Sequence, residues 1–199
     1  MGFDIYGTNP RNPKNLEKPK LDWSKETTEE EKKKYFKDME YYEETVKGYY
    51  FRNNVWWWRP LANAIVLYND WLTEKQIEHL SYNDGFEFSD EEAEKIRNSL
   101  LKRLEDGTFK KMEDEWKKKA KVAEKWNTKV EKEMEKLGVL AEKELGKKDV
   151  APMDFPPKIK EKWDKLYETK DRTCMYPFSV ANIKRFCLFL KDCGGFKVC

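Results

Sequence analysis

The chain has 199 residues, of which 39% are charged and 39% hydrophobic. Charged residues exceed the roughly 25% of an ordinary globular domain, but aromatic residues reach 15%, so the chain can bury a core and is not expected to be disordered. The formal net charge is only +2. A global basic field that would gather nucleic acid is therefore excluded, and nucleic-acid binding is not expected.

The sequence shows no signal for a membrane or for secretion. It contains no apolar run near the ~18 residues that a transmembrane helix needs. The opening MGFDIYG lacks the basic stretch and the apolar run of a signal peptide. We therefore expect a cytosolic protein with no membrane partner.

The first part of the chain predicts a strand, an irregular connection and a helix. GFDIYG at 2–7 is typical of a short extended segment, and the prolines of the following NPRNPKNLEKPK exclude a regular element there. The acidic residues after Thr27 and Thr28 favour a helix start. Gly48 is expected to end that helix.

The centre of the chain predicts a second extended segment and two further helices. YYFRNNVWW can be extended, and Pro60 is well placed as the first residue of the next helix. The stretch SYNDGFEFS, at 81–89, is a loop or hairpin because Asn-Asp-Gly favours a turn. Ser89 and Glu92 form a capping box for a helix that Gly107 stops.

Residues 109–148 form a distinct charged segment. They include 13 lysines, nine acidic residues and no arginine, and their apolar residues recur every three or four positions. This spacing predicts a long amphipathic helix, or a pair of helices broken near Gly138. We expect it to be a solvated arm that protrudes from a single domain spanning 1–199.

The C-terminal segment predicts the centre of the fold. Ser179 is a plausible N-cap for a helix that is apolar over most of its circumference, which is typical of a buried helix. Gly194 and Gly195 stop it, and FKVC can form a closing strand. The expected fold is mainly α (α+β), with a small sheet built from the N-terminal, central and C-terminal extended segments.

Common catalytic and metal-binding signatures are missing. The sequence has no phosphate-binding loop, no dinucleotide fingerprint and no HExxH motif, and its one histidine is His79. The four cysteines are Cys174, Cys187, Cys193 and Cys199, and they contain no CxxC pair. We therefore expect no metal or cofactor. Whether these cysteines pair with one another or bind a metal stays open. A hydrolase or transferase acting through carboxylates also stays open, although nothing singles one out.

The run RNNVWWWRP, at 52–60, is the richest candidate for a binding site. Tryptophan faces stack on planar heterocycles, arginines pair with phosphate, and asparagine amides hydrogen-bond to base or ribose edges. The alternative is that the tryptophans only anchor the core. In an extended run Trp57 would point away from Trp56 and Trp58 and differ from both in exposure, whereas in a helix the three rings would fan around the axis.

Together, four motifs give the chain a resemblance to a known family. GFDIYG, YFRNNVWWWRPL, YNDG and the C-terminal YPFS…GGF cover about half of it. With them the chain resembles a family of uncharacterised proteins encoded largely by bacteriophages. The resemblance implies phage origin and action in the host cytoplasm, and it brings no established activity. Phage proteins of this size often counter host defence, some of them by sequestering nucleotide-derived signals.

These observations lead to one expected function and one alternative. We expect a non-catalytic protein that binds a small anionic, nucleotide-like ligand. Trp57 would stack, Arg52 and Arg59 would hold phosphate or carboxylate, and the N-terminal segment and the YNDG loop would complete the pocket. The expected ligand-binding residues are Asp4, Tyr6, Arg52, Asn53, Trp57, Arg59, Tyr82, Asn83 and Asp84. The alternative is an inhibitor of a host or phage protein, such as a host defence protein, that acts through the charged arm. Homo-oligomerisation stays open.

Overall fold

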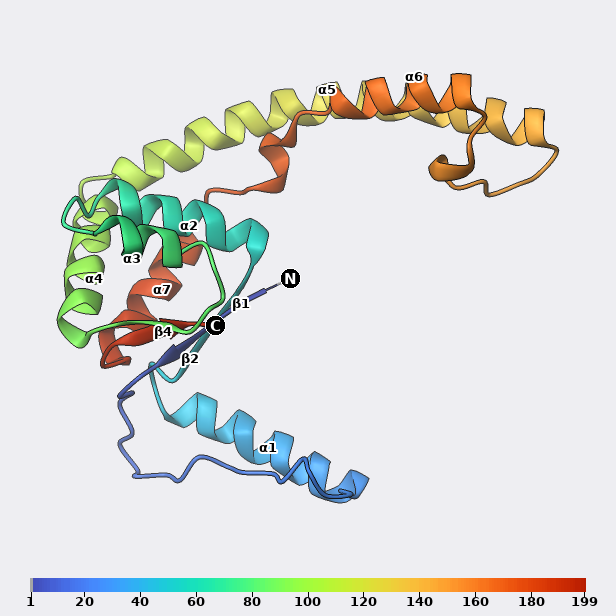
Figure 1. The fold of residues 1–199 in the computed structure, drawn as a ribbon. Coiled ribbons are helices and arrows are strands. Elements are labelled where there is room, and N and C mark those ends of the chain that lie inside the picture. The colour runs from blue at the N-terminus through green and yellow to red at the C-terminus, as the bar shows by residue number, and fades with distance from the viewer. Residues whose placement is uncertain (1) are drawn as a thin grey trace. The chain divides into compact units, whose positions relative to one another are not determined.

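The computed structural model describes residues 2–199. These residues form seven α-helices, two 3₁₀ turns and four strands (Figure 1). In chain order they are β1 Gly2–Gly7, α1 Glu29–Thr45, β2 Tyr50–Asn54, α2 Val55–Leu67, α3 Glu74–His79, β3 Phe86–Phe88, α4 Asp90–Glu105, α5 Thr108–Leu145, η1 Pro152–Asp154, α6 Pro157–Glu168, η2 Arg172–Met175, α7 Val180–Asp192 and β4 Phe196–Val198. The predicted fold class, mainly α with a small sheet, is confirmed.

The chain divides into two compact units. Unit 1 consists of Met1–Lys111 and Phe178–Cys199, and unit 2 is Met112–Pro177. Unit 1 holds the sheet and the helices that pack on it. Unit 2 holds most of α5, together with α6 and both 3₁₀ turns.

The sheet of unit 1 is antiparallel, with the strand order β2-β1-β4-β3. It contains the three predicted strands and adds β3, in a segment for which the sequence predicts a loop or hairpin. Alternate residues of β1 face opposite sides, so Phe3 and Ile5 are buried while Asp4 and Tyr6 lie on the outward face. The register places Asp4 opposite Arg52 and Tyr6 opposite Tyr50.

Helices α2 and α7 cover the inner face of the sheet, and Trp58 lies at the centre of the resulting core. Its ring is fully buried and stacks on Phe3 with 5.4 Å between ring centroids. It meets Phe186 of α7 edge-on at 5.8 Å. The indole Nε1 donates to the carbonyl of Leu80 at 2.7 Å, so the one polar group of this ring is satisfied inside the core. As predicted, α7 packs into the core, with six of its 13 residues buried, although its other side is exposed.

Local capping signals place most helix starts correctly. Ser89 and Glu92 form a capping box and Ser179 caps α7, as the sequence predicts. The predicted helix start at Thr28 is also correct, and Thr28 forms a capping box with Glu31. The predicted start at Pro60 is wrong, because α2 begins at Val55. The side chain of Asn54 accepts a hydrogen bond from the backbone of Trp57 at 3.0 Å and starts the helix five residues earlier. Pro60 then lies inside α2, which lacks one backbone hydrogen bond there.

Unit 2 is an antiparallel pair of helices. Helix α5 runs without a break through Gly138, so of the two predicted forms the single long helix is correct. The chain after α6 is tied back to α5, since Trp126 Nε1 donates to the carbonyl of Thr169 at 2.7 Å. The side chain of Asn127 also exchanges two hydrogen bonds of 2.8 Å with the backbone of Asp171. Figure 1 shows α6 running beside α5.

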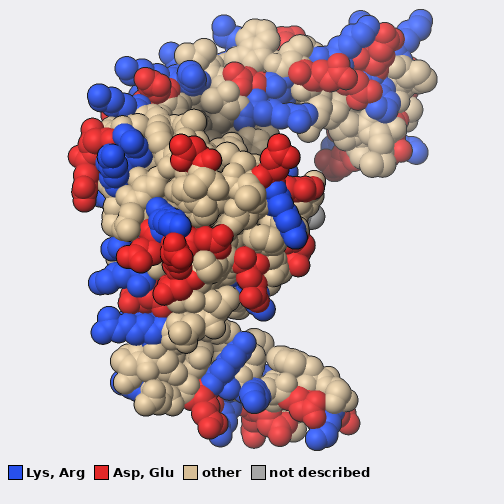
Figure 2. All heavy atoms as spheres, turned by 60° about the vertical axis from the view of Figure 1, so that its left-hand side comes forward, with Lys and Arg blue, Asp and Glu red and all other residues tan. Residues whose placement is uncertain are grey.

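Charges of both signs are mixed on the surface. On the face drawn in Figure 2, lysine and arginine side chains alternate with aspartate and glutamate. This agrees with the net charge of +2. Among residues 2–199, none of the helices has the length and apolar character needed to cross a bilayer.

Candidate functional site

The three tryptophans lie in the first turn of α2 and fan around its axis. Trp56 is 37% exposed, Trp57 is 38% exposed and Trp58 is fully buried. The alternation expected of an extended run, with Trp57 differing from both neighbours, is therefore wrong. The helical alternative holds, because successive helical residues are turned by about 100° and only one of the three rings can face the core. Trp57 is left partly open at the start of the helix.

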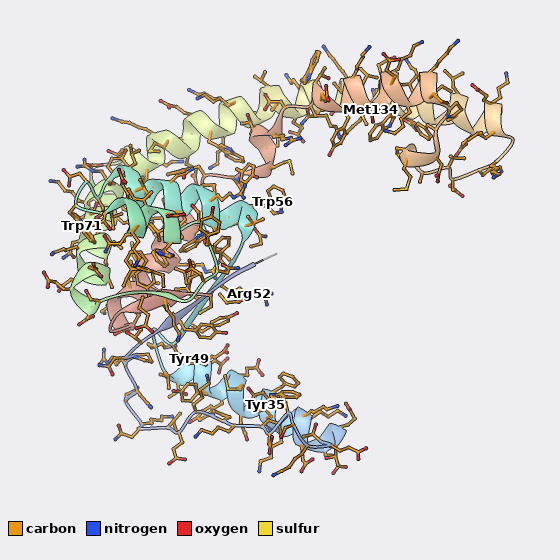
Figure 3. The ribbon with its side chains drawn as sticks, viewed as in Figure 1. Tyr35, Tyr49, Arg52, Trp56, Trp71 and Met134 are labelled. Carbon is orange, nitrogen blue, oxygen red and sulfur yellow. The ribbon has the colours of Figure 1, made fainter. Side chains whose placement is uncertain are left out.

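Trp57 opens onto a pocket of about 610 Å³ between β2, α2 and α7. We call it the α2–α7 pocket. Its lining residues are Arg52, Asn53, Asn54, Trp57, Ser179, Ala181, Asn182 and Arg185. All of them belong to unit 1. In Figure 3, Arg52 is labelled on β2 and Trp56 at the start of α2. The pocket thus lies where the strand passes into the helix.

Two helix N-termini meet at this pocket. Asn54 is the N-cap of α2 and Ser179 is the N-cap of α7, and both side chains line the pocket. A helix N-terminus carries roughly half a positive charge from its aligned peptide dipoles. The backbone here therefore favours a negatively charged group.

The side chains add to this positive character. Two arginines line the pocket and no acidic residue does so among those that the structure describes. The guanidinium of Arg185 lies 5.3 Å above the ring of Phe51. Arg52 Nε lies 3.6 Å from a carboxylate oxygen of Asp4, but the Arg52 side chain is 70% exposed. A salt bridge so open to solvent is weak, and it leaves the Arg52 guanidinium able to bind another anion.

Two buried polar atoms of the pocket have no hydrogen-bond partner in the described chain. They are Nδ2 of Asn53 and Oδ1 of Asn182, on side chains that are 6% and 5% exposed. The Asn182 amide is oriented by its other end, since Nδ2 donates to the carbonyl of Trp57 at 3.2 Å. An unsatisfied buried polar atom costs about 1–3 kcal/mol. The fold therefore carries one unpaired donor and one unpaired acceptor on residues that line the pocket.

Two other predicted residues form a separate group on the outward face of the sheet. The hydroxyl of Tyr50 donates to the carboxylate of Asp4, and the ring of Tyr6 lies 5.1 Å from that of Tyr50. Burial, together with the hydrogen bond to Asp4, raises the pKa of Tyr50 well above its ordinary value. Asp4 is therefore a neighbour of Arg52 and Tyr6 a neighbour of Tyr50, and neither lines the α2–α7 pocket.

The YNDG loop lies between α3 and β3 and is also outside the pocket. Asn83 Nδ2 donates to the carbonyl of Gly2 at 2.7 Å, and Asp84 accepts from the backbone of Phe86 at 3.1 Å and pairs with His79. Tyr82 is 56% exposed. The remaining predicted residue, Arg59, is exposed on α2 and is not among the lining residues that the structure describes. Of the nine predicted residues, the pocket brings together Arg52, Asn53 and Trp57.

The sequence missed five lining residues: Asn54, Ser179, Ala181, Asn182 and Arg185. Ser179 was recognised only as a cap. A signal for Asn182 was present, since it is a polar residue in a helix whose neighbours Ile183 and Phe186 are apolar and buried. Its pairing with Trp57, 125 positions away, depends on tertiary structure and has no sequence signal.

The described residues offer little for covalent or metal chemistry. Within 2–199 no three His, Cys, Asp or Glu side chains are placed to bind a metal ion. All four cysteines are free thiols. Burial raises the pKa of Cys187 to about 11 and that of Cys193 to about 12, so both stay protonated and poorly nucleophilic at neutral pH.

Comparisons with models of known protein families, with curated proteins and with solved structures found no match to this chain.

Proposed function

We propose that the protein binds a small planar anion in the α2–α7 pocket and does not transform it. The observation that carries this proposal is the pair of unpartnered buried atoms, Asn53 Nδ2 and Asn182 Oδ1, in a pocket lined by two arginines and no acid. A ligand with an acceptor and a donor on one edge and a negative group on another would satisfy all of them. Nucleotides have this combination.

The pocket supplies each interaction that such a ligand needs. Arg52 and Arg185 can pair with phosphate or carboxylate, and the two helix N-termini favour the same charge. The partly exposed ring of Trp57 offers a face for a planar group, and stacking of a base on an aromatic ring contributes roughly 1–3 kcal/mol.

The biological role that we propose is that of a phage protein acting in the host cytoplasm. By binding a nucleotide-derived signal it would withdraw that signal from a host defence system. The support is the resemblance in the four sequence motifs, together with the chemistry of the pocket.

Calorimetric titration against mono-, di- and cyclic nucleotides tests the binding. Heating the purified protein and analysing the released compounds by mass spectrometry tests the same point without choosing a ligand. We expect one compound to bind at one site per chain. Replacing Arg185 by Ala removes a charge-assisted hydrogen bond of about 1.5–3 kcal/mol, which raises Kd roughly 10- to 150-fold.

Arg59→Ala is the matched control, because it removes an exposed arginine of α2 that does not line the pocket. It should leave Kd within about twofold. Equal losses in the two variants would refute the pocket as the binding site. Failure of every nucleotide to bind, with nothing released on heating, would refute the function.

A second candidate function is binding of a host or phage protein through the charged arm. The observation that favours it is a set of exposed apolar side chains on α5, with Val122 at 69%, Val139 at 61% and Leu140 at 52%. Replacing these three by lysine would abolish capture of a protein partner and leave nucleotide binding intact if the arm is the binding surface.

A further inference from the structure

Strand β2 is an edge strand, and its hydrogen bonding follows from the register. Gly7 N donates to the carbonyl of Tyr49 at 2.9 Å, so Tyr49, Phe51 and Asn53 direct their backbone groups toward β1. Tyr50 and Arg52 direct theirs to the opposite side. No strand within residues 2–199 pairs with β2 on that side. Two N–H groups and two carbonyls therefore point outward.

A groove of about 650 Å³ runs along this open edge. We call it the edge groove. Its floor is Tyr49, Tyr50, Phe51 and Arg52 of the strand region, and its far wall is formed by α7. On that wall Leu188 is 68% exposed, as an apolar residue on the exposed side of α7. An added strand would lie about 4.8 Å from β2, and the same stretch of β2 lines the groove.

The charges of the edge groove favour an acidic occupant. Four basic residues line it, namely Lys47, Arg52, Arg185 and Lys191, against Glu43 and Asp192. Asp192 already lies 3.6 Å from the guanidinium of Arg11. The net charge offered to an occupant is therefore positive, and complementary charge selects partners and speeds their encounter.

We propose that an extended, acidic segment of a partner protein binds in the edge groove as a fifth strand of the sheet. Its main chain pairs with the outward N–H and C=O groups of Tyr50 and Arg52. Side chains of a strand alternate, so acidic residues on one side meet Arg52 while apolar residues on the other side meet Leu188.

This surface is distinct from the α2–α7 pocket but adjoins it. The two share Arg52 and Arg185, whereas Leu188 and Lys191 line only the groove and Trp57 and Asn182 line only the pocket. The inference does not depend on the proposed function, and variants of the unshared residues separate the two.

The probe is an acetylated and amidated nonapeptide of alternating glutamate and valine, titrated into the ¹⁵N-labelled full chain. The matched control peptide alternates lysine and valine. In the free protein the amides of Tyr50 and Arg52 should exchange with solvent faster than those of Phe51 and Asn53, which bond to β1. The glutamate peptide should slow exchange at Tyr50 and Arg52 roughly tenfold or more, and the lysine peptide should bind at least roughly tenfold more weakly.

Two N-methylated isomers of the glutamate peptide test the strand pairing itself. Methylating every second amide blocks either the N–H groups that face β2 or those that face away, so only one isomer should bind. Leu188→Glu and Lys191→Glu should each weaken the peptide roughly tenfold and leave anion binding unchanged. Trp57→Ala should weaken anion binding and leave peptide binding unchanged.

Three results would overturn the proposal. They are equal binding of the glutamate and lysine peptides, equal binding of the two N-methylated isomers, and no slowing of exchange at Tyr50 and Arg52 at a saturating peptide concentration. If Trp57→Ala loses anion binding while peptide binding is unaffected, the result supports the α2–α7 pocket as the anion site and the edge groove as a separate site.

Discussion

At the scale of single residues, Gly48 joins two distant segments of unit 1. Its φ is +74°, and a Cβ atom there would lie 2.2 Å from the carbonyl carbon of Asp192. Backbone atoms cannot yield to such an overlap. Gly7 lies at the same crossing, where its Cβ would meet the carbonyl oxygen of Gly48 at 2.1 Å. The close approach of these chains thus requires the absence of a side chain.

We predict that Gly48→Ala destabilises the protein far more than Gly85→Ala. Both glycines have positive φ, at +74° and +80°, but a Cβ at Gly85 would meet nothing within 4 Å. The left-handed conformation alone costs about 1–2 kcal/mol. The overlap with Asp192 should add at least about 1–3 kcal/mol in Gly48→Ala. Urea unfolding of the two variants measures the difference, and equal losses would contradict a tight crossing.

At the scale of elements, α5 keeps its helical form over Gly138. The residue has no positive φ, and a Cβ added there would meet only the ring of Phe155, at 3.9 Å. That distance is an ordinary van der Waals contact. The glycine therefore weakens the helix without serving the packing.

We predict that Gly138→Ala stabilises α5. Alanine is favoured over glycine in a helix interior by about 0.8–1.0 kcal/mol. Native-state hydrogen exchange of the α5 amides around position 138 should slow roughly fivefold. Gly107→Ala is the contrasting change, since φ there is +77° and the residue ends a helix, so it should destabilise. A loss of protection in Gly138→Ala would show that the glycine has a structural role.

At the scale of the whole molecule, the chain leaves and re-enters unit 1 at neighbouring points. Phe109 and Phe178 lie with their ring centroids 5.8 Å apart, although 69 positions separate them in sequence. Both the sheet and every residue that lines the α2–α7 pocket belong to unit 1. In sequence, unit 2 is an insertion between two segments of unit 1, one that ends near Phe109 and one that begins at Phe178.

We predict that unit 1 folds after Met112–Pro177 is replaced by a short glycine-serine linker, and that it keeps the anion binding that we propose for the α2–α7 pocket. Closing so short a gap costs little loop entropy, and the core around Trp58 is unchanged. Circular dichroism, thermal unfolding and calorimetry of the excised protein measure this. An unfolded product would show that unit 2 is needed for the fold of unit 1.

The sequence predicted what depends on local chemistry. The capping boxes at Thr28 and Ser89 lie within four residues of the helices that they start, so a short window contains the whole signal. The prediction at Pro60 was wrong because Asn54, another local cap, lies six residues before it and starts α2 at Val55. For the site, Arg52, Asn53 and Trp57 were visible as one segment.

The other half of the site could not be predicted from the same window. Asn182 and Arg185 approach Trp57 and Arg52 only because α7 packs on the sheet, and no local pattern specifies that meeting. The YNDG loop was predicted to line the pocket because its residues are polar. Its asparagine instead hydrogen-bonds to Gly2, and its aspartate to His79 and Phe86.

The position of β4 has a consequence for how the molecule forms during synthesis. β4 lies between β1 and β3, so β1 gains its first neighbour after about 50 residues and its second only when Phe196–Val198 has emerged. Contacts so distant in sequence form slowly. Helix α7, which supplies half of the α2–α7 pocket, emerges at the same late stage. A nascent chain therefore presents the β2 side of the α2–α7 pocket without the α7 side, and the binding that we propose for this pocket should appear abruptly once α7 and the last strand have joined the sheet.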